Sequence, residues 1–321
     1  MHSAQFSRRP HRTLTLLAAV AVAGIGLLAS PPARAATSGW IEDAGVAYTA
    51  PACTITGGGS NLLGDVYRPA SPPAGALPAV VLIHGGGFIA GSRAGSALGP
   101  MSEELATLGY VVYNIDYCLA SNKHSPPVRG YPMQVTDVED AAKALTGKGF
   151  DQGRVDVNKA KVALWGSSAG ATLSVLTGVQ LGNAGFTPAA AVGWSGGYDF
   201  LDFRGGNPHN EQGPRAFLGC DPQTDKSATC QDRSRSASAA LNVTAATPPM
   251  SLWNSSDELV PITQWQDMKA ALSKAGIPYS ATELQGTKHA TAYVQTAFCP
   301  TVKFLETYLG PVNGTCVYPP A

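Results

Sequence analysis

The stretch Gly166-Ser167-Ser168-Ala169-Gly170 decides the fold expected for this chain. A strand-like run, Lys161–Trp165, precedes it, and a segment of small and apolar residues, Ser168–Val179, follows it with a helical composition. The flanking glycines allow a sharp strand-to-helix turn that exposes Ser168 with strained backbone angles. A serine at a helix N-terminus also lies where developing negative charge is favoured. Ser168 is therefore the candidate nucleophile, although a Gly-Ser turn without chemistry has the same letters.

A second glycine-rich motif, His84-Gly85-Gly86-Gly87-Phe88, lies upstream of the serine and directly follows the apolar run Ala79–Ile83. A carbonyl that becomes tetrahedral gains negative charge, and backbone N–H groups aimed at its oxygen stabilise that charge. Glycines let the backbone approach without a side chain in the way. We expect the amides of Gly86, Gly87 and Ala169 to form an oxyanion hole. The alternative is a flexible glycine turn.

A serine nucleophile needs a general base, and four histidines follow residue 35. His289 comes after the late strand-like run Tyr279–Leu284, so the chain order is serine, then acid, then histidine, as in α/β-hydrolases. His84 belongs to the glycine motif and is better placed to brace that turn. His124 precedes the serine in a proline-rich loop, and His209 lies in an irregular segment. His289 is therefore the expected base.

The acid that orients the base should follow the strand before the last one. That strand is predicted at Met250–Trp253, and the loop after it contains Asp257 and Glu258. Asp257 is the expected catalytic acid, because a shorter carboxylate is commoner at this place, and Glu258 is the alternative. Asp199 and Asp202, after an earlier strand, fit less well. The acid would hold the imidazole in the right tautomer and stabilise the imidazolium.

Strand-like and helix-like segments alternate along most of the chain, which predicts an α/β fold with a mostly parallel central sheet covered by helices on both faces. Strands are expected at 79–83, 110–115, 161–165, 189–194, 250–253 and 279–284, an antiparallel edge strand at 61–67, and helices at 100–108, 131–145, 168–179, 261–274 and 293–309. The polar segment at about 196–249 breaks this rhythm. So long an insertion in a compact domain is usually functional, and we expect a small lid or rim beside the site.

The motifs together resemble the hormone-sensitive-lipase-like and feruloyl-esterase-like group of bacterial α/β-hydrolases. The resemblance rests on HGGGF at His84, GSSAG around Ser168, the D-x-L-V-P turn at Asp257 and the late His289. It extends from about Asn61 to Leu309. It implies the α/β-hydrolase fold and ester hydrolysis. The chain departs from that group by its six cysteines and by lacking the long N-terminal helical cap of many relatives, which suggests a more open site.

The first 35 residues have the layout of a secretory signal peptide. Arginines at 8, 9 and 12 precede the apolar run Leu14–Ala29, and Ala33-Arg34-Ala35 is a small-x-small cleavage pattern. A single transmembrane anchor is the alternative, and the export route, general or twin-arginine, stays open. We therefore expect residues 1–35 to be removed and 36–321 to form a single secreted, extracellular domain. Loss of four arginines would change the net charge from zero to −4.

Six cysteines, an even number in an exported chain, predict three disulfides. Short spacing favours Cys220–Cys230 and Cys299–Cys316, which leaves Cys53 with Cys118. A metal or redox site is disfavoured, because the chain contains no Cys-x-x-Cys and no histidine at ligand spacing from a cysteine.

These features predict a secreted serine carboxylesterase that hydrolyses short-chain or plant-polysaccharide-linked acyl esters through an acyl-enzyme on Ser168. A secreted serine peptidase and a non-catalytic binding protein on a hydrolase scaffold are the alternatives. We expect no cofactor and no metal. Because no basic run follows residue 35, neither nucleic acid nor a membrane surface is an expected partner. The protein is expected to be a monomer acting on a small-molecule or polymer-linked ester.

Overall fold

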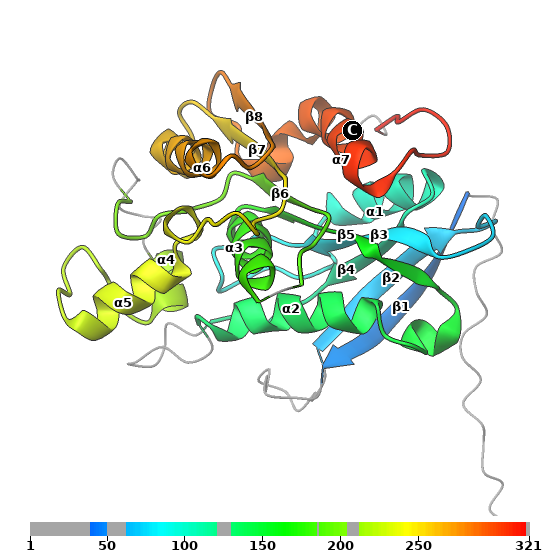
Figure 1. The fold of residues 1–321 in the computed structure, drawn as a ribbon, viewed down its shortest axis with the longest axis horizontal. Helices are drawn as coiled ribbons and strands as arrows, with labels where there is room; N and C mark the ends of the chain where they lie inside the picture. Colours follow the sequence, from blue (N-terminus) through cyan, green and yellow to red (C-terminus); the bar gives the residue numbers. More distant parts are fainter. Residues whose placement is uncertain (1–38, 50–61, 121–129, 185, 204–211, 319–321) are drawn as a thin grey trace, which may run out of the picture. The chain divides into compact units, whose positions relative to one another are not determined.

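An eight-stranded sheet forms the centre of the unit Ala33–Ala321 in the computed structural model (Figure 1). The structure describes residues 39–49, 62–120, 130–184, 186–203 and 212–318. The strands are β1 (Trp40–Thr49), β2 (Leu62–Pro69), β3 (Leu77–Ile83), β4 (Val111–Ile115), β5 (Val157–Ser167), β6 (Ala190–Trp194), β7 (Met250–Ser255) and β8 (Tyr279–Leu284). All the predicted strands are present; 279–284 has the predicted ends, and the others are shifted at one or both ends.

The sheet order is β1-β2-β4-β3-β5-β6-β7-β8. β2 pairs antiparallel with both β1 and β4, and every pair from β4–β3 to β7–β8 is parallel. β1 was not predicted, so β2 is the second strand and not the edge strand expected from the sequence. The carboxyl ends of the parallel strands meet along one edge, where loops of α/β folds carry ligand sites.

Helices cover both faces of the sheet, as the alternating pattern predicts. The α-helices are α1 (Leu98–Thr107), α2 (Met133–Leu145), α3 (Ala169–Asn183), α4 (Gln212–Leu218), α5 (Ala228–Ala237), α6 (Ile262–Ala275) and α7 (Val294–Leu309), with short 3-10 helices η1 (Phe150–Gly153), η3 (Ala239–Leu241) and η4 (Ala290–Tyr293). Apolar side chains of α2, α3 and α6 share one core with one face of the sheet, and those of α1 and α7 share the other. The central strands are therefore buried on both sides, which explains the continuous apolar run of β3.

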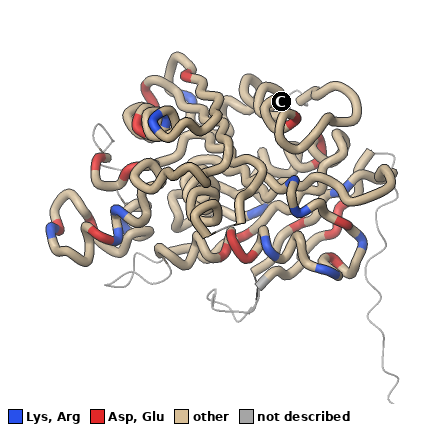
Figure 2. The backbone as a smooth tube through the Cα atoms, viewed as in Figure 1, with Lys and Arg blue, Asp and Glu red and all other residues tan. Residues whose placement is uncertain are grey.

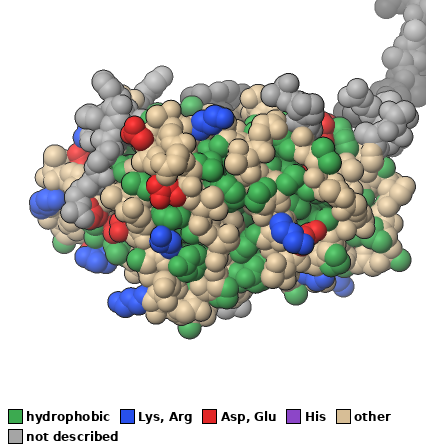
Figure 3. Space-filling model, turned by 90° about the horizontal axis from the view of Figure 1, so that it is seen from above, with side chains coloured by type: hydrophobic (Ala, Val, Ile, Leu, Met, Phe, Trp, Pro, Cys, Tyr) green, Lys and Arg blue, Asp and Glu red, His purple; other side chains and the backbone are tan. Residues whose placement is uncertain are grey.

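Helix α3, which begins directly after Ser168, carries no charged residue (Figure 2). Most of its side chains are buried on all sides, because it packs between the sheet and α2. Charged side chains lie elsewhere, and on the face seen in Figure 3 they are sparse and of mixed sign among uncharged and hydrophobic ones. The candidate nucleophile therefore lies directly before the N-terminus of a helix whose side chains are mostly buried.

The insertion at about 196–249 contains α4, α5 and η3, two more α-helices than its composition predicted. Two of the expected disulfides are confirmed: Cys220–Cys230 links the end of α4 to α5, and Cys299–Cys316 links α7 to the segment that follows it. Cys118 is also disulfide-bonded, and its expected partner, Cys53, lies outside the described residues. A carboxylate oxygen of Asp225 lies within 4.8 Å of the sulfurs of Cys220 and Cys230. Because both sulfurs are in the disulfide, they are not thiolate ligands.

The expected signal peptide, residues 1–35, lies outside the described residues. Within the part of the chain that the structure describes, no helix combines the length and the apolar character needed to cross a bilayer.

Asp137 of α2 makes stability depend on pH. Burial raises the pKa of its carboxyl from 3.8 to about 6, against the hydrogen bond it accepts from the Cys118 amide. Between these pH values the folded protein binds more protons than the unfolded chain, so the free energy of unfolding falls as pH rises from about 4 to 6. Asp137→Asn keeps an acceptor for the amide and removes the charge. We expect this variant to exceed the wild type at pH 7 by up to about 3 kcal/mol, with the difference vanishing near pH 4.

Urea unfolding at several pH values measures this effect. The control is Asp232→Asn, on the exposed side of α5, which should leave the pH slope of the free energy unchanged. An equal slope in wild type and Asp137→Asn would contradict the assignment to Asp137.

Candidate active site

Ser168 occupies a tight turn between β5 and α3. Its backbone angles are φ 55° and ψ −123°, outside the regions that L-residues prefer. The glycines of the motif are required by space, because a Cβ on Gly166 would lie 2.0 Å from the Gly170 carbonyl oxygen, and one on Gly170 would lie 2.3 Å from that of Ile83. The Ser168 amide donates to the Trp194 carbonyl at the end of β6, at 2.7 Å. The turn is therefore held strained by its neighbours.

His289 lies beside the serine. Its Nε2 is 2.8 Å from Ser168 Oγ, although the two residues are 121 positions apart in sequence. The loop after β8 carries the histidine, and Ser255 at the end of β7 holds that loop by donating its hydroxyl to the Lys288 carbonyl. Across a short hydrogen bond the imidazole can take a proton from the serine hydroxyl.

The carboxylate beside the other ring nitrogen belongs to Glu258. Its Oε2 contacts His289 Nδ1, and its side chain is fully buried. Oε1 accepts from the Ser255 amide at 2.9 Å and from the Ser195 hydroxyl at 2.7 Å. The expectation of Asp257 as the acid is wrong, because Asp257 lies at the exposed tip of the turn after β7, where its amide donates to the Gly286 carbonyl. The next residue, Glu258, has a longer side chain, which is buried and reaches the histidine.

The glycine loop after β3 lies on the other side of Ser168. Gly86 and Gly87 have φ of 119° and 59°, and the next residue, Phe88, keeps φ at 67° despite its side chain. A Cβ on Gly86 would lie 2.0 Å from the Ala90 carbonyl oxygen. Among the described residues none accepts from the amides of Gly86, Gly87 or Ala169, and all three residues line one cavity with Ser168. These amides can therefore donate hydrogen bonds to an oxyanion in this cavity.

Gln134 of α2 holds the glycine loop from behind. Its buried amide donates to the Phe88 carbonyl at 2.9 Å and to the Cys118 carbonyl at 2.5 Å. The Phe88 carbonyl also accepts from the Ala120 amide at 2.8 Å. Two donors on one carbonyl fix a residue whose backbone angles are unfavourable. The strained end of the loop is thus tied to α2 and to the segment after β4.

His84 braces the start of the same loop, and its recorded hydrogen bonds are to Gly85 and Tyr117 rather than to Ser168 or His289. Its Nδ1 donates to the Gly85 carbonyl at 2.6 Å, and its ring stacks on Tyr117 with centroids 4.2 Å apart. Burial lowers the pKa of His84, so the imidazole remains neutral at pH 7 and keeps one ring proton for this bond. In turn Tyr117 donates its hydroxyl to the His84 carbonyl at 3.2 Å.

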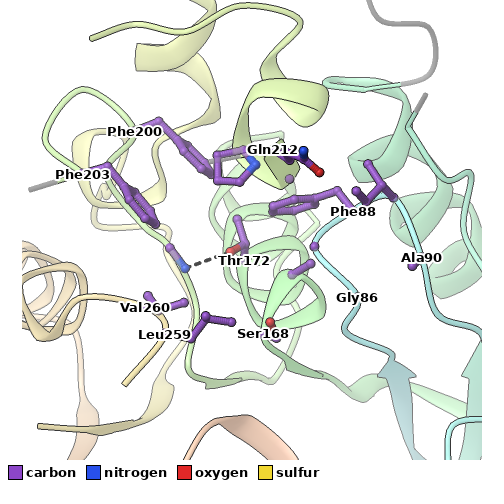
Figure 4. A pocket seen from close by; sticks show the side chains of 16 residues that line it. Gly86, Phe88, Ala90, Ser168, Thr172, Phe200, Phe203, Gln212, Leu259 and Val260 are labelled. Atoms are coloured by element: carbon purple, nitrogen blue, oxygen red, sulfur yellow. Dashed lines mark hydrogen bonds between the residues drawn. The ribbon is translucent and has the colours of Figure 1, made fainter. Parts of the chain in front are cut away.

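Two cavities meet at Ser168. The first, of about 300 Å³, is mostly apolar and is lined by Phe88, Phe200, Phe203 and Val260, with Thr172 and Gln212 near them (Figure 4). The second, of about 500 Å³, is lined by small and hydroxyl-bearing residues of the loop after β3 and by the residues around His289. Leu259, 43% exposed, borders both. The site therefore has an aromatic side and a more polar side, called the polar cavity below, and His289 lies on the latter.

The insertion covers the aromatic side. Phe217 of α4 stacks on Phe88 of the glycine loop with centroids 4.3 Å apart, and it also contacts Phe200 and Tyr131. Gly213 at the start of α4 lies so close to the loop that a Cβ there would be 2.4 Å from the Gly87 carbonyl oxygen. Residues of the insertion thus form one wall of the aromatic cavity.

Two residues of this site were not expected from the sequence in the places they hold: Gln134 behind the loop and Ser195 beside the acid. Glu258, expected only as the alternative to Asp257, is the histidine's partner. A signal exists for Ser195, which directly follows the apolar run of β6, where polar residues of a parallel sheet tend to be functional. No comparable signal exists for Gln134, since it lies within an amphipathic helix.

Comparison with known proteins places these features in a family. Residues 64–272, more than half of the chain, match the family described as BD-FAE. Esterase LipC of Mycobacterium tuberculosis is 31% identical over 148 residues, covering 43% of this chain and 34% of that protein. Non-reducing polyketide synthase ascC of Acremonium egyptiacum is 32% identical over 138 residues, covering 42% of this chain and 6% of the synthase. The chain thus matches a minor part of either relative.

Solved structures share the fold. A truncated carbohydrate esterase from gut microbiota superposes with a TM-score of 0.67 at 18% identity, covering 85% of this chain and 98% of that one. Together with the sheet order and the strand-turn-helix at Ser168, this likeness confirms the predicted α/β-hydrolase fold. By its sequence match over residues 64–272, the chain belongs to the BD-FAE family.

Proposed function

We propose that the protein is a serine carboxylesterase that hydrolyses carboxylic esters through an acyl-enzyme on Ser168. The observation that carries the proposal is the connected chain of Ser168, His289 and Glu258 at the mouth of two cavities. Membership of the BD-FAE family and the match to an esterase support the same reaction class.

Ser168 Oγ attacks the ester carbonyl while His289 Nε2 takes the hydroxyl proton. Glu258 holds the imidazole tautomer and stabilises the imidazolium. The carbonyl oxygen becomes an oxyanion and accepts from the amides of Gly86, Gly87 and Ala169, the last of which also lies at the positive end of the α3 dipole. When the tetrahedral intermediate collapses, His289 protonates the leaving alcohol. Water then repeats the sequence, and the carboxylic acid leaves.

We propose that each half of the ester occupies one of the two cavities. Because the leaving oxygen takes its proton from His289, the alcohol occupies the polar cavity that contains this residue, and the acyl group occupies the aromatic one. A volume of about 300 Å³ suits a short acyl chain or a single ring. The glycine- and serine-rich polar cavity suits an alcohol with further hydroxyl groups, such as a sugar. One structural neighbour is itself called a carbohydrate esterase.

Hydrolysis of p-nitrophenyl esters from acetate to palmitate tests the proposal, followed by acetylated and feruloylated polysaccharide. The disulfide-bonded protein should turn over short esters and discriminate strongly against palmitate. A fluorophosphonate should also attach to the peptide that contains Ser168, as identified by mass spectrometry. Absence of both turnover and labelling would refute the esterase assignment.

We also propose that the protein is secreted after cleavage behind Ala35. The leader pattern at residues 8–35 and the two disulfides Cys220–Cys230 and Cys299–Cys316 support export, since disulfides persist in oxidising compartments. N-terminal sequencing of protein recovered from culture medium should begin at Ala36. An intact Met1 on the exported protein would contradict it.

Gln134→Leu is expected to lower kcat about tenfold and to leave KM within about threefold. The change removes one of the two donors to the Phe88 carbonyl, so the oxyanion amides lose part of their preorganisation. Steady-state kinetics on a short ester, with thermal unfolding measured in parallel, gives the result. Gln180→Leu is the matched control, because Gln180 bonds Tyr131 near the other end of α3. Equal kcat in the two variants would show that Gln134 does not support the loop's function.

A further inference from the structure

Ser195, the first residue after β6, is fully buried beside the acid and has a positive φ of 61°. Its Oγ lies 2.7 Å from Glu258 Oε1, 2.8 Å from the Tyr293 hydroxyl and 2.9 Å from the Ala290 amide nitrogen. A hydroxyl has one donor and two acceptor positions. All three are used here, which makes Ser195 the meeting point of the acid and the turn after the histidine.

The direction of these bonds follows from the charge on Glu258. An ionised carboxylate only accepts, so the Ser195 proton points to Glu258, and Ser195 Oγ accepts from the Ala290 amide. The single proton of the Tyr293 hydroxyl is shared between Ser195 Oγ at 2.8 Å and the Trp253 carbonyl at 3.2 Å. Burial raises the pKa of Tyr293 well above its ordinary value, so its hydroxyl keeps the proton that it donates. The other titratable groups recorded nearby are His289, which contacts Glu258 Oε2, and the buried Tyr198.

Adjacent residues at the end of β6 hold all three members of the triad. The Trp194 carbonyl accepts from the Ser168 amide at 2.7 Å, and the Ser195 hydroxyl reaches Glu258 and the amide that follows His289. The Ser195 amide in turn donates to the Trp253 carbonyl of β7 at 2.8 Å. The end of β6 therefore fixes the position of the nucleophile relative to the acid and the base.

We propose that Ser195 is a positioning residue whose hydroxyl holds the Glu258 carboxylate and the His289 turn in register for proton transfer. This role rests on the proposed esterase function. Without the hydroxyl, Glu258 Oε1 keeps one donor, and the buried Ala290 amide loses its acceptor. The carboxylate is destabilised most when His289 is neutral, because the imidazolium compensates the charge. The pair then binds its proton more tightly, and the acid limb of the kcat/KM profile moves to higher pH.

The test compares Ser195→Ala, Ser195→Gly and Ser195→Cys in the disulfide-bonded protein on a short p-nitrophenyl ester. Glycine relieves the positive φ, and cysteine preserves the shape but is a weak donor. All three variants should lose tenfold to a hundredfold in kcat with KM within about threefold, and their acid limbs should move to higher pH. Ser174→Ala is the control, because it removes a buried hydroxyl bonded to the Val192 carbonyl of the same strand.

Full activity of Ser195→Gly or Ser195→Cys would overturn the proposal, since either would show that backbone angle or volume is what matters. So would a loss of kcat with an unmoved pH profile and a lowered melting temperature, which indicates a merely structural role. Assays of the wild-type protein distinguish failure of the proposed esterase function from failure of the proposed role of Ser195. If it hydrolyses no ester and takes no fluorophosphonate, the proposed function fails first; if it is active and the variants match it, the role of Ser195 alone fails.

Discussion

Ser168→Ala is expected to lower kcat for ester hydrolysis about a millionfold, to the level set by binding and the oxyanion amides alone. The serine oxygen forms the covalent bond in the proposed mechanism, and the described residues around His289 Nε2 offer no substitute, since Ser168 Oγ is the atom 2.8 Å from it. KM should change little, because both cavities keep their walls. Fluorophosphonate labelling of this peptide should disappear with the activity.

Ser174→Ala, on the same helix, serves as the control and should keep wild-type kcat. Because a millionfold loss is easily masked, the variant must be purified from a host without background esterase. A Ser168→Ala protein that retains more than a few per cent of wild-type kcat would exclude Ser168 as the nucleophile. The fold would stand in that case, and the chemistry would need a different residue.

Glu258→Gln is expected to lower kcat by about a thousandfold to ten-thousandfold, and Asp257→Asn by less than about twofold. Glutamine retains the size of the side chain but loses the charge that stabilises the imidazolium, and it can present an N–H to His289 Nδ1, which favours the wrong tautomer. Asp257 is exposed, and its link to the loop of His289 is a backbone amide that the substitution retains. The two variants differ by one position and should differ by orders of magnitude.

Steady-state kinetics of both variants on one ester decides which carboxylate is the acid. Glu258→Asp adds a second comparison, because it keeps the charge but shortens the side chain by one methylene and should recover part of the loss. A larger effect of Asp257→Asn than of Glu258→Gln would reverse the assignment made from the structure. Thermal unfolding must accompany the kinetics, since Glu258 is buried and accepts from the Ser255 amide.

Local chemistry made much of this protein predictable. The G-x-S-x-G turn needs glycine because the backbones at Gly166 and Gly170 approach too closely for a side chain. The glycine loop needs positive φ at Gly86 and Gly87. The approach of Gly166 to the Gly170 carbonyl and the positive φ values involve residues close in sequence, so the sequence alone reveals them. Gly170 also meets the Ile83 carbonyl, a contact between residues far apart in sequence. The sequence alone also reveals the strand–helix alternation and the two disulfides with short spacing.

Edge elements and the insertion were harder to predict. β1 is half exposed and pairs with a strand that begins more than ten residues later, so its pattern is weak. Helices α4 and α5 owe their place to aromatic contacts such as Phe217 with Phe88, and to the Cys220–Cys230 link, rather than to a periodic apolar face. Because long-range packing stabilises these two helices, the composition of the insertion alone predicts a loop.

By itself the sequence determined the fold class, the serine at the strand-to-helix turn, the glycine loop and the late histidine, because each depends on residue type and chain order. Tertiary structure alone decided between Asp257 and Glu258, since adjacent residues in a turn point in different directions and only packing selects which carboxylate is buried. It also brought Ser195 and Gln134 to the site from separate elements. Their roles follow from distances across the fold, which no local pattern encodes.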